Sequence, residues 1–245
     1  NYEVDPDNRL LWRANPRQLD AESLRDSVLA LSGHLNLDRP FASEIAAEGD
    51  KRIGRQFDGS TAGDNSKHRS VYLPILRDSL PEALALFDFA DPNASAEKRT
   101  STNVPSQSLF LMNNSFVLEQ ARGMAAKLSE KFTSPEQQVE HAFLLAYGRP
   151  ATDDEILASL EFYERFLPEA RRNFFANRTS VTQPRGPAAG QRSVGQPGRR
   201  PFGQFPRGGR RPGGGPPQPP LNPAQQTLMA FCQGLMASAE FRILN

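Results

Sequence analysis

His68–Asn114, HRSVYLPILRDSLPEALALFDFADPNASAEKRTSTNVPSQSLFLMNN, is the stretch that decides the fold. It opens with an apolar run over residues 71–76, continues into a short helix expected to start at Pro81, and ends with a second helix start at Pro105. Proline is favoured in the first turn of a helix because its missing N–H has no intrahelical partner there. Little sequence separates these pieces. We therefore expect this stretch to be a structural hub for the flanking helices.

The apolar run predicts a strand or an extended segment, because apolar residues alternate along it. Pro74 restricts any strand to the edge of a sheet, since proline cannot donate a ladder hydrogen bond. The residues of the hub that we expect to meet the flanking helices are Val71, Leu73, Leu84, Phe87, Leu109 and Phe110.

The segment before the hub predicts one clear helix. Asp20 is a suitable N-cap, and apolar residues recur at helical spacing from Leu24 to Leu35. We interpret its charged residues, Glu22, Arg25 and Asp26, as a solvated face. In the irregular lead-in, we expect Leu10, Leu11 and Trp12 to anchor the chain to the core.

The segment after the hub predicts four more helices with well-marked ends. The N-terminal signals are Ser115, Ser134-Pro135, the capping-box pair Thr152 and Glu155, and Asn222-Pro223. Gly148 marks the end of the second of these helices, and Pro168 is expected to kink or end the third. The fold class predicted is mainly α: an irregular multi-helix bundle with short extended segments.

A long Arg/Gly/Pro-rich segment interrupts the helices. Residues 177–222 hold eight Arg, ten Gly and ten Pro and no Asp, Glu or Lys. Such a segment buries too little apolar surface to offset its ordering entropy, so we predict a disordered loop. Removing its eight positive charges from the net charge of +1 leaves −7 for the remainder. We expect one helical domain, 1–176 plus 223–245, and the loop is a candidate for polyanion or nucleic-acid binding.

The hub also carries the candidate site residues. Asp88 and Asp91 are a candidate pair for acid/base chemistry, or for binding a Ca²⁺ ion together with nearby backbone carbonyls, and Arg69, Arg99 and His68 are near them in sequence. The competing interpretation is structural: both aspartates cap turns and accept from arginines, because Asp-Pro-Asn is ordinary turn chemistry. Residue chemistry alone leaves open whether the protein is an enzyme.

Metal and cofactor ligands are sparse in the sequence. His34, His68 and His141 share neither a helical face nor a close spacing, so we expect no metal site. The single cysteine, Cys232, excludes an internal disulfide and a Cys-based haem attachment within this chain. No window is apolar enough to predict a transmembrane segment.

Five separated segments together resemble one family. They are NRLLWRANPRQLDAESLRDSVLALSGHL (8–35), RSVYLPILRDSLPEALALFDFADPN (69–93), TNVPSQSLFLMNNSFVLEQARGMA (102–125), AYGRPATDDEI (146–156) and LMASAEFRILN (235–245). This order resembles the later part of the planctomycete domain of unknown function found C-terminal to planctomycete cytochrome C modules.

The resemblance implies a context rather than a reaction, since it brings no catalytic residues with it. It implies a multidomain, extracytoplasmic protein, periplasmic or at the cell surface. Haem c is expected only in an upstream module, with no cofactor in this chain, and the expected partners are the upstream cytochrome c and companion domains of the same polypeptide. The function expected is a non-catalytic helical scaffold or binding module. The alternatives are a module that binds or degrades polysaccharide in a polar cleft around Arg69, Asp88 and Asp91, and polyanion binding through the Arg-rich loop.

Overall fold

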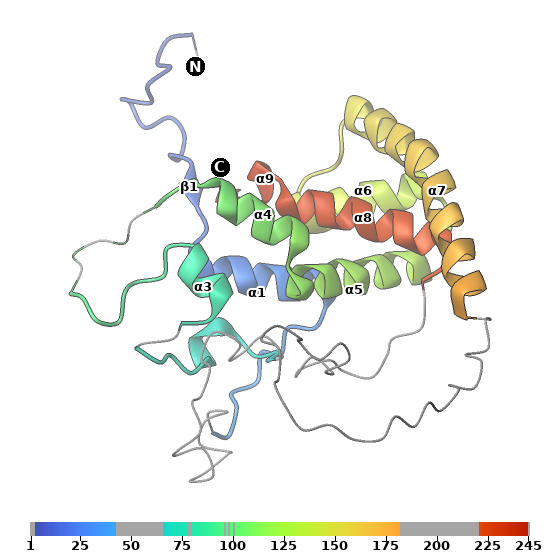
Figure 1. Ribbon diagram of the computed structural model, residues 1–245. Coiled ribbons are helices and arrows are strands. Elements are labelled where there is room, and N and C mark those ends of the chain that lie inside the picture. The colour runs from blue at the N-terminus through green and yellow to red at the C-terminus, as the bar shows by residue number, and fades with distance from the viewer. Residues whose placement is uncertain are drawn as a thin grey trace, which may run out of the picture.

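The computed structural model describes residues 3–42, 66–77, 80–95, 97, 99, 101–181 and 221–244, and the chain is mainly helical there, as predicted (Figure 1). Its elements, in chain order, are β1 (Arg17–Gln18), α1 (Ala21–Ser32), the 3-10 helix η3 (Ser70–Tyr72), α3 (Glu82–Leu86), α4 (Pro105–Asn113), α5 (Ser115–Lys131), α6 (Pro135–Tyr147), α7 (Asp153–Val181), α8 (Pro223–Ala237), α9 (Ala239–Arg242) and β2 (Ile243–Leu244).

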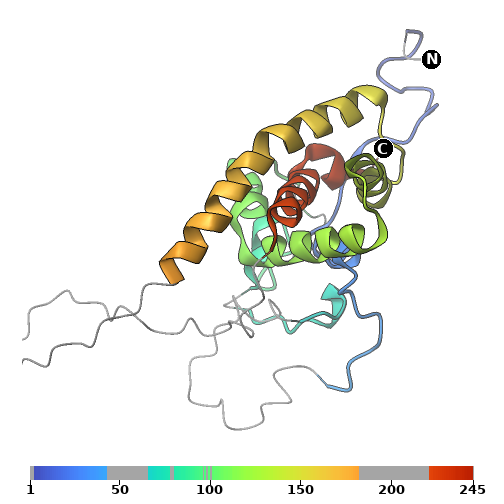
Figure 2. The same ribbon diagram turned by 90° about the vertical axis from the view of Figure 1, so that its right-hand side faces the viewer.

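Helix α5 is the centre of the bundle. It packs against α1 on one side and α8 on the other, and α7 crosses α8 diagonally from outside (Figures 1 and 2). The strands β1 and β2 pair antiparallel, with Arg17 opposite Leu244 and Gln18 opposite Ile243. This short ribbon joins the beginning of the bundle to its end.

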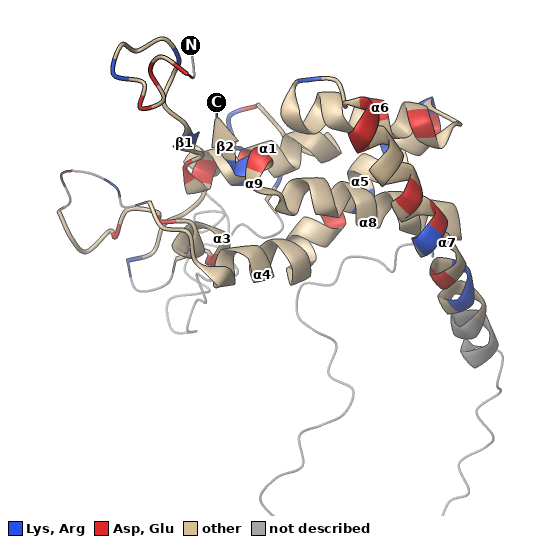
Figure 3. Cartoon of the chain, turned by 90° about the horizontal axis from the view of Figure 1, so that it is seen from above, with Lys and Arg blue, Asp and Glu red and all other residues tan. Residues whose placement is uncertain are grey.

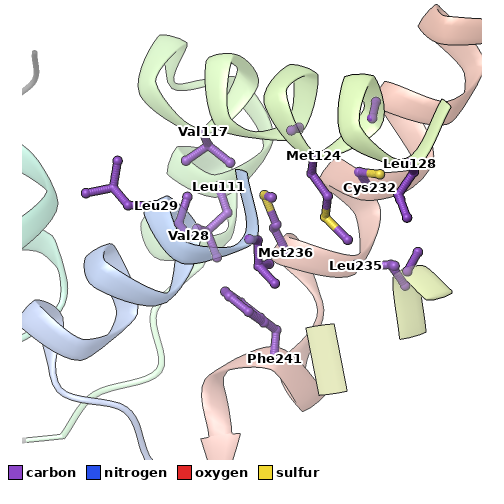
Figure 4. Packing of buried hydrophobic residues seen from close by; sticks show 14 of the residues in the cluster. Val28, Leu29, Leu111, Val117, Met124, Leu128, Cys232, Leu235, Met236 and Phe241 are labelled. Carbon is purple, nitrogen blue, oxygen red and sulfur yellow. The ribbon is translucent and has the colours of Figure 1, made fainter. Parts of the chain in front are cut away.

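The core lies where α1, α5 and α8 meet (Figure 4). Leu24, Val28 and Leu31 recur at helical spacing along α1 and are buried, as the periodicity predicts. They pack with Met124 of α5 and Met236 of α8, both fully buried. Burying one such side chain stabilises the fold by about 1.5–3 kcal/mol relative to leaving it exposed, so this cluster fixes how the helices pack.

Capping side chains fix most of the predicted helix starts. Ser134 Oγ accepts from the backbone N–H of Gln137 at 3.2 Å, and Asn222 Oδ1 accepts from that of Gln225 at 2.8 Å. At the start of α5 the cap is Asn114, one residue earlier than predicted, which accepts from Phe116 N. Asp20 occupies the N-cap position of α1, but its side chain makes no capping hydrogen bond.

The hub begins with a tight turn rather than a strand. Residues 70–72 form η3, and the backbone is extended at Leu73, the residue that ends it. The turn forms because Asp26 Oδ1 of α1 accepts from both the backbone N–H and the hydroxyl of Ser70, at 2.7 Å each. A side chain distant in sequence therefore overrides the local alternation.

The hub packs only partly as predicted. Leu73, Leu84 and Phe110 are buried, whereas Val71 is 67% and Leu109 59% exposed. Period-two alternation predicted that Val71 and Leu73 share a face, but η3 turns Val71 outward. Leu109 lies on the outer face of α4, while its neighbour Phe110 faces the core.

The lead-in is held by polar contacts instead of an apolar anchor. Leu10 and Leu11 are 77% and 76% exposed, so the predicted anchoring by these residues is wrong. The buried residues of the lead-in are Asp5 and Asn8, and the Asp5 carboxylate accepts from the backbone N–H groups of Arg9 and Leu10 at 2.9 and 2.7 Å. Trp12 Nε1 donates to the Asp5 carbonyl at 2.9 Å.

Helix α7 is longer than the sequence predicts. It continues through Pro168 to Val181, so the proline does not end it, and the helix enters the segment predicted to be disordered. Asn222 at the far end of that segment is the ordered N-cap of α8. The remaining residues, 182–220, lie outside the described part of the chain, and so do the predictions of disorder and polyanion binding that fall on them.

Candidate functional site

Arg25 and Asp26 are embedded between α1 and the start of the hub. Arg25 is 4% exposed and donates to the carbonyls of Ser66 and His68, at 2.7 and 3.1 Å, and to Ser70 Oγ at 3.3 Å. Asp26 binds Ser70 from the other side. The prediction that these charges form a solvated face is wrong, because they hold residues 66–72 against α1. This Arg25–Asp26 clamp had no signal in the local sequence.

The clamp region also contains two of the candidate site residues. His68 pairs with Asn36 in an isolated parallel bridge, and its Nδ1 lies 3.0 Å from the carbonyl oxygen of Asp38. Arg69 Nε lies 3.8 Å from Asp26 Oδ2, with its side chain half exposed. Both residues thus join the segment after residue 65 to the region around α1.

Asp88 and Asp91 form separate turns. Asp88 has a φ of 60°, and its carboxylate accepts from the backbone N–H of Thr102 at 2.7 Å and from its hydroxyl at 2.9 Å. Asp91 Oδ1 accepts from the backbone N–H of Asn93 at 2.8 Å. The hydrogen bonds described for the two carboxylates come from Thr102 and Asn93 rather than from arginines.

Arg99 is joined to α1. Its guanidinium donates two hydrogen bonds to the carboxylate of Glu22, at 2.8 and 2.9 Å, and lies 5.3 Å from the ring centre of Phe89. Burial pushes the pKa of Glu22 up, but the hydrogen bond from Arg99, a backbone hydrogen bond and the charge of Arg99 together outweigh it and hold the pKa below its ordinary value. The hydrogen bond to Glu22 raises the pKa of Arg99.

A cleft of about 220 Å³ opens where the two chain ends meet the hub. It lies between β1, the connection from α3 to α4, and the residue that precedes β2. Its lining residues are Arg17, Gln18, Leu19, Asp20, Leu24, Phe87, Asp88, Arg99, Ser101, Gln107 and Arg242. Of the five candidate site residues, Asp88 and Arg99 line this cleft, whereas His68, Arg69 and Asp91 do not.

Several polar groups of the cleft have no partner among the described residues. Arg17 is exposed and makes no hydrogen bond or salt bridge there, and neither does the carboxylate of Asp20. Arg242 uses only Nε, in a long contact of 3.4 Å to the Ser238 carbonyl. Ser101 donates to Gln18 Oε1 at 2.5 Å, which leaves the amide N–H groups of Gln18 available. Free cationic and free acceptor groups therefore face the same space.

Sequence reasoning missed the two free arginines of this cleft. Arg17 and Arg242 come from opposite ends of the chain, and the ribbon that brings them together has two residues in each strand. So short a pairing has no detectable period in the sequence. Gln107 is buried against the same cleft and donates to the Leu86 carbonyl at 3.1 Å, which fixes the end of α3.

A second charged cluster involves α9, the helix that ends at Arg242. Arg149 donates to the carboxylates of both Glu155 and Glu240, with hydrogen bonds of 2.7–2.9 Å. The bonds from Arg149 to Glu155 lower the pKa of Glu155 to about 2, with a smaller contribution from Thr152. The cluster joins the start of α7 to α9, and Tyr147 Oη donates to Ser238 Oγ beside it at 2.9 Å. Its role follows from these bonds: it orients the last helices.

An apolar groove of about 320 Å³ lies between α6, α7 and α8. Most of its lining is apolar, with Phe143, Phe162 and Phe231 beside Ala230 and Gly234, and Glu155 at the start of α7 is its charged member. A Cβ added at Gly234 would meet no atom within 4 Å, so the groove is open there. Helix α8, which lines the groove, and α4, which packs on α8, contain no Lys, Arg, Asp or Glu (Figure 3).

The described residues bear on metal ligation, on the reactivity of the single cysteine and on membrane spanning. Within that part of the chain, no group of three or more His, Cys, Asp or Glu side chains is placed to hold a metal ion. Cys232 is fully buried in the core, and burial raises the pKa of its thiol. No helix among the described residues is both long and apolar enough to cross a membrane.

Fold and site together define a helical domain whose candidate polar residues mostly hold loops and helix ends in place. A small polar cleft and an apolar groove lie at the surface of its described part. The comparisons identify the family of this domain. The model of PSD1, a protein of unknown function (DUF1553), matches residues 1–163, so the chain belongs to this family. No curated protein and no solved structure matches the chain.

Proposed function

We propose that the chain is a non-catalytic helical binding module of an extracytoplasmic, cytochrome-c-associated multidomain protein. The observation that carries this proposal is that the predicted site residues form hydrogen bonds within the fold. Asp88 is bonded to Thr102, Asp91 to Asn93, and Arg99 to Glu22. Catalysis by general acids and bases needs such groups to converge on one substrate position. Here most of them stabilise separate turns and helix contacts.

The binding surface is the α4–α8 face, defined as exposed Leu109 and Met112 of α4 with Ala230, Phe231 and Gly234 of α8. Leu109 and Met112 are each 59% exposed, although both are large and apolar. Helix α4 contacts α8, and Gln233 of α8 donates to the Met112 carbonyl at 2.6 Å. The exposed side chains and the apolar groove therefore lie on adjoining helices.

The absence of charge on this face favours a protein partner. Burying a charged side chain without a partner costs several kcal/mol, and α4 and α8 have none to bury. The centres of protein interfaces are likewise depleted of charge and enriched in methionine and aromatic residues. The occupant we propose is an apolar surface of the companion, haem-bearing part of the same polypeptide. Extracytoplasmic location and haem in that part are components of the proposal, and both rest on the family resemblance.

The test is an association measurement between the purified chain and the remainder of its polypeptide, followed by the absorbance of haem retained on the immobilised chain. We expect saturable binding that weakens at least tenfold in Met112→Glu, because the new carboxylate would be desolvated in the interface. Val71→Glu is the matched control, since Val71 is 67% exposed, against 59% for Met112, but lies on the hub. It should leave the affinity unchanged.

Three results would contradict the proposal. Equal weakening by Val71→Glu and Met112→Glu would remove the α4–α8 face as the site. A remainder without haem would remove the cytochrome component. If Asp91→Asn lost binding while Met112→Glu kept its affinity, the binding site would lie on the hub and not on the α4–α8 face. Fractionation of the source cells tests location, and recovery of the protein in the cytoplasm would contradict that component.

A further inference from the structure

We propose that the cleft between β1, the α3–α4 connection and β2 binds an acidic sugar, a ring that carries a carboxylate beside free hydroxyl groups. The proposal goes beyond the docking function and is independent of it, because the cleft and the α4–α8 face share no residue. Its basis is the set of unpaired groups that line one small space.

The cationic side of the cleft is formed by Arg17 and Arg242. Arg17 has no hydrogen-bond or salt-bridge partner among the described residues, and Arg242 has only the 3.4 Å contact of its Nε. The pairing of β1 with β2 holds the two backbones together, because Leu19 N donates to the Arg242 carbonyl at 2.8 Å. Guanidinium groups bind carboxylates through two parallel hydrogen bonds, so this side recognises an anionic group.

Other lining residues of the cleft offer groups for hydroxyls. Asp20 has a free carboxylate that accepts hydrogen bonds, and the amide of Gln18 has free N–H donors. Asp88 also lines the cleft, with its oxygens already bonded to Thr102. A hydroxyl both donates and accepts, so it can satisfy an aspartate and an amide side by side.

The mixed charge of the cleft excludes simpler ligands. A bare anion such as phosphate would meet the carboxylates of Asp20 and Asp88 as well as the arginines. A neutral sugar would leave both free guanidiniums without a partner. Arg99 does not decide between them, because its charge is already paired with Glu22, to which it donates two of its five N–H groups.

The apolar lining and the size fit a single ring. Phe87, Leu19 and Leu24 supply an apolar wall against which the C–H face of a sugar can pack. The volume of about 220 Å³ is below the range of pockets that enclose drug-sized molecules, roughly 300–1,000 Å³. The cleft therefore holds one residue of a saccharide, whose neighbours extend into solvent.

The experiment is isothermal titration of the whole chain with trigalacturonate, the neutral galactose trisaccharide, galactose sulfate, inorganic phosphate and glycine. We expect saturable binding of trigalacturonate and at least tenfold weaker binding of the neutral trisaccharide, because two charge-assisted hydrogen bonds are lost. Galactose sulfate that binds as well as the carboxylate sugar would also support the site, as the same guanidiniums would hold the sulfate.

Variants assign the binding to the cleft. Arg17→Gln should weaken trigalacturonate at least tenfold with an unchanged thermal transition, because Arg17 is exposed and bonds to no other described side chain. Arg242→Gln and Asp20→Asn should weaken it as well. Arg165→Gln removes the same charge from a side chain that is 78% exposed on α7, and it should bind like the unmodified chain.

Four results would overturn the proposal. They are the absence of saturable binding, equal affinity for the neutral trisaccharide, stronger binding of phosphate or glycine than of trigalacturonate, and unchanged affinity in Arg17→Gln. The last result would place the acidic sugar on another cationic part of the chain, such as the Arg-rich segment.

Discussion

Replacing Arg25 with methionine should destabilise the fold more than any other single change to a charged residue discussed above. Arg25 is 4% exposed and donates to three oxygens at and just before the start of the hub, on Ser66, His68 and Ser70. Methionine has a similar length, so the change removes the hydrogen bonds while it keeps most of the packing. The acceptors would remain in place without a donor.

The magnitude follows from the burial of those acceptors. The bonds to Ser66 and Ser70 are buried, and the bond to His68 is partly buried. An unsatisfied buried acceptor costs about 1–3 kcal/mol. Water can reach the partly buried His68 carbonyl after a small movement, so the acceptors on Ser66 and Ser70 account for most of the cost. We expect the free energy of unfolding to fall by about 2–6 kcal/mol, which is twice the cost of one unsatisfied buried acceptor.

Urea unfolding followed by circular dichroism measures this change, with Arg9→Met as the control, since Arg9 is 82% exposed. The control should change the free energy of unfolding by less than about 0.5 kcal/mol. In Arg25→Met, the backbone amide of Ser70 should exchange its hydrogen faster; in the folded chain this N–H donates to Asp26 Oδ1. A loss below about 1 kcal/mol for Arg25→Met, with exchange at Ser70 unchanged, would refute the clamp.

Three further predictions test other parts of the fold. Hydrogen bonds from Arg149 lower the pKa of Glu155 to about 2, so the ionised carboxylate stabilises the folded chain at pH values above its ordinary pKa of 4.5. This stabilisation is lost as the pH falls from 4.5 towards 2. Glu155→Gln should remove that part of the acid dependence of urea unfolding. Leu84→Ala should cost about 2–5 kcal/mol, because Leu84 is 0% exposed, whereas Leu109→Ala should cost less than about 0.5 kcal/mol. Gly148→Ala should lower the thermal transition by the equivalent of about 1 kcal/mol, because φ is 71° and no atom crowds the new Cβ.

Each of these predictions has its own contradicting result. An unchanged acid profile in Glu155→Gln would show that the carboxylate does not depend on Arg149. Equal losses for the two leucine variants would contradict the placement of the hub against the core. A neutral or stabilising Gly148→Ala would contradict the left-handed end of α6.

Helix ends could be predicted from the sequence because each is decided by a few neighbouring residues. Ser134 and Asn222 each satisfy a backbone N–H group three positions away, so the signal of these helix starts is entirely local. The same holds for the left-handed glycine at position 148. Pro168 shows the limit of local rules, since α7 continues through it to Val181.

The polar contacts between distant segments could not be predicted in the same way. The charges of α1 have the spacing of a solvated face, and only the arrival of residues 66–70 turns Arg25 into a buried donor. Asp88 was identified as a candidate, but its partner Thr102 lies across a loop without periodicity. The two free arginines of the cleft meet through a two-residue strand pair. Such contacts depend on tertiary packing, for which a single sequence has no local signal.

The most direct test of the binding-module account is hydrogen exchange of the chain alone and in complex with the haem-bearing remainder of its polypeptide. The account predicts slower exchange on binding in residues 105–113 and 223–237, which form α4 and α8, and little change in residues 66–77 and 85–95. Protection confined to residues 66–95, with α4 and α8 unchanged, would contradict it.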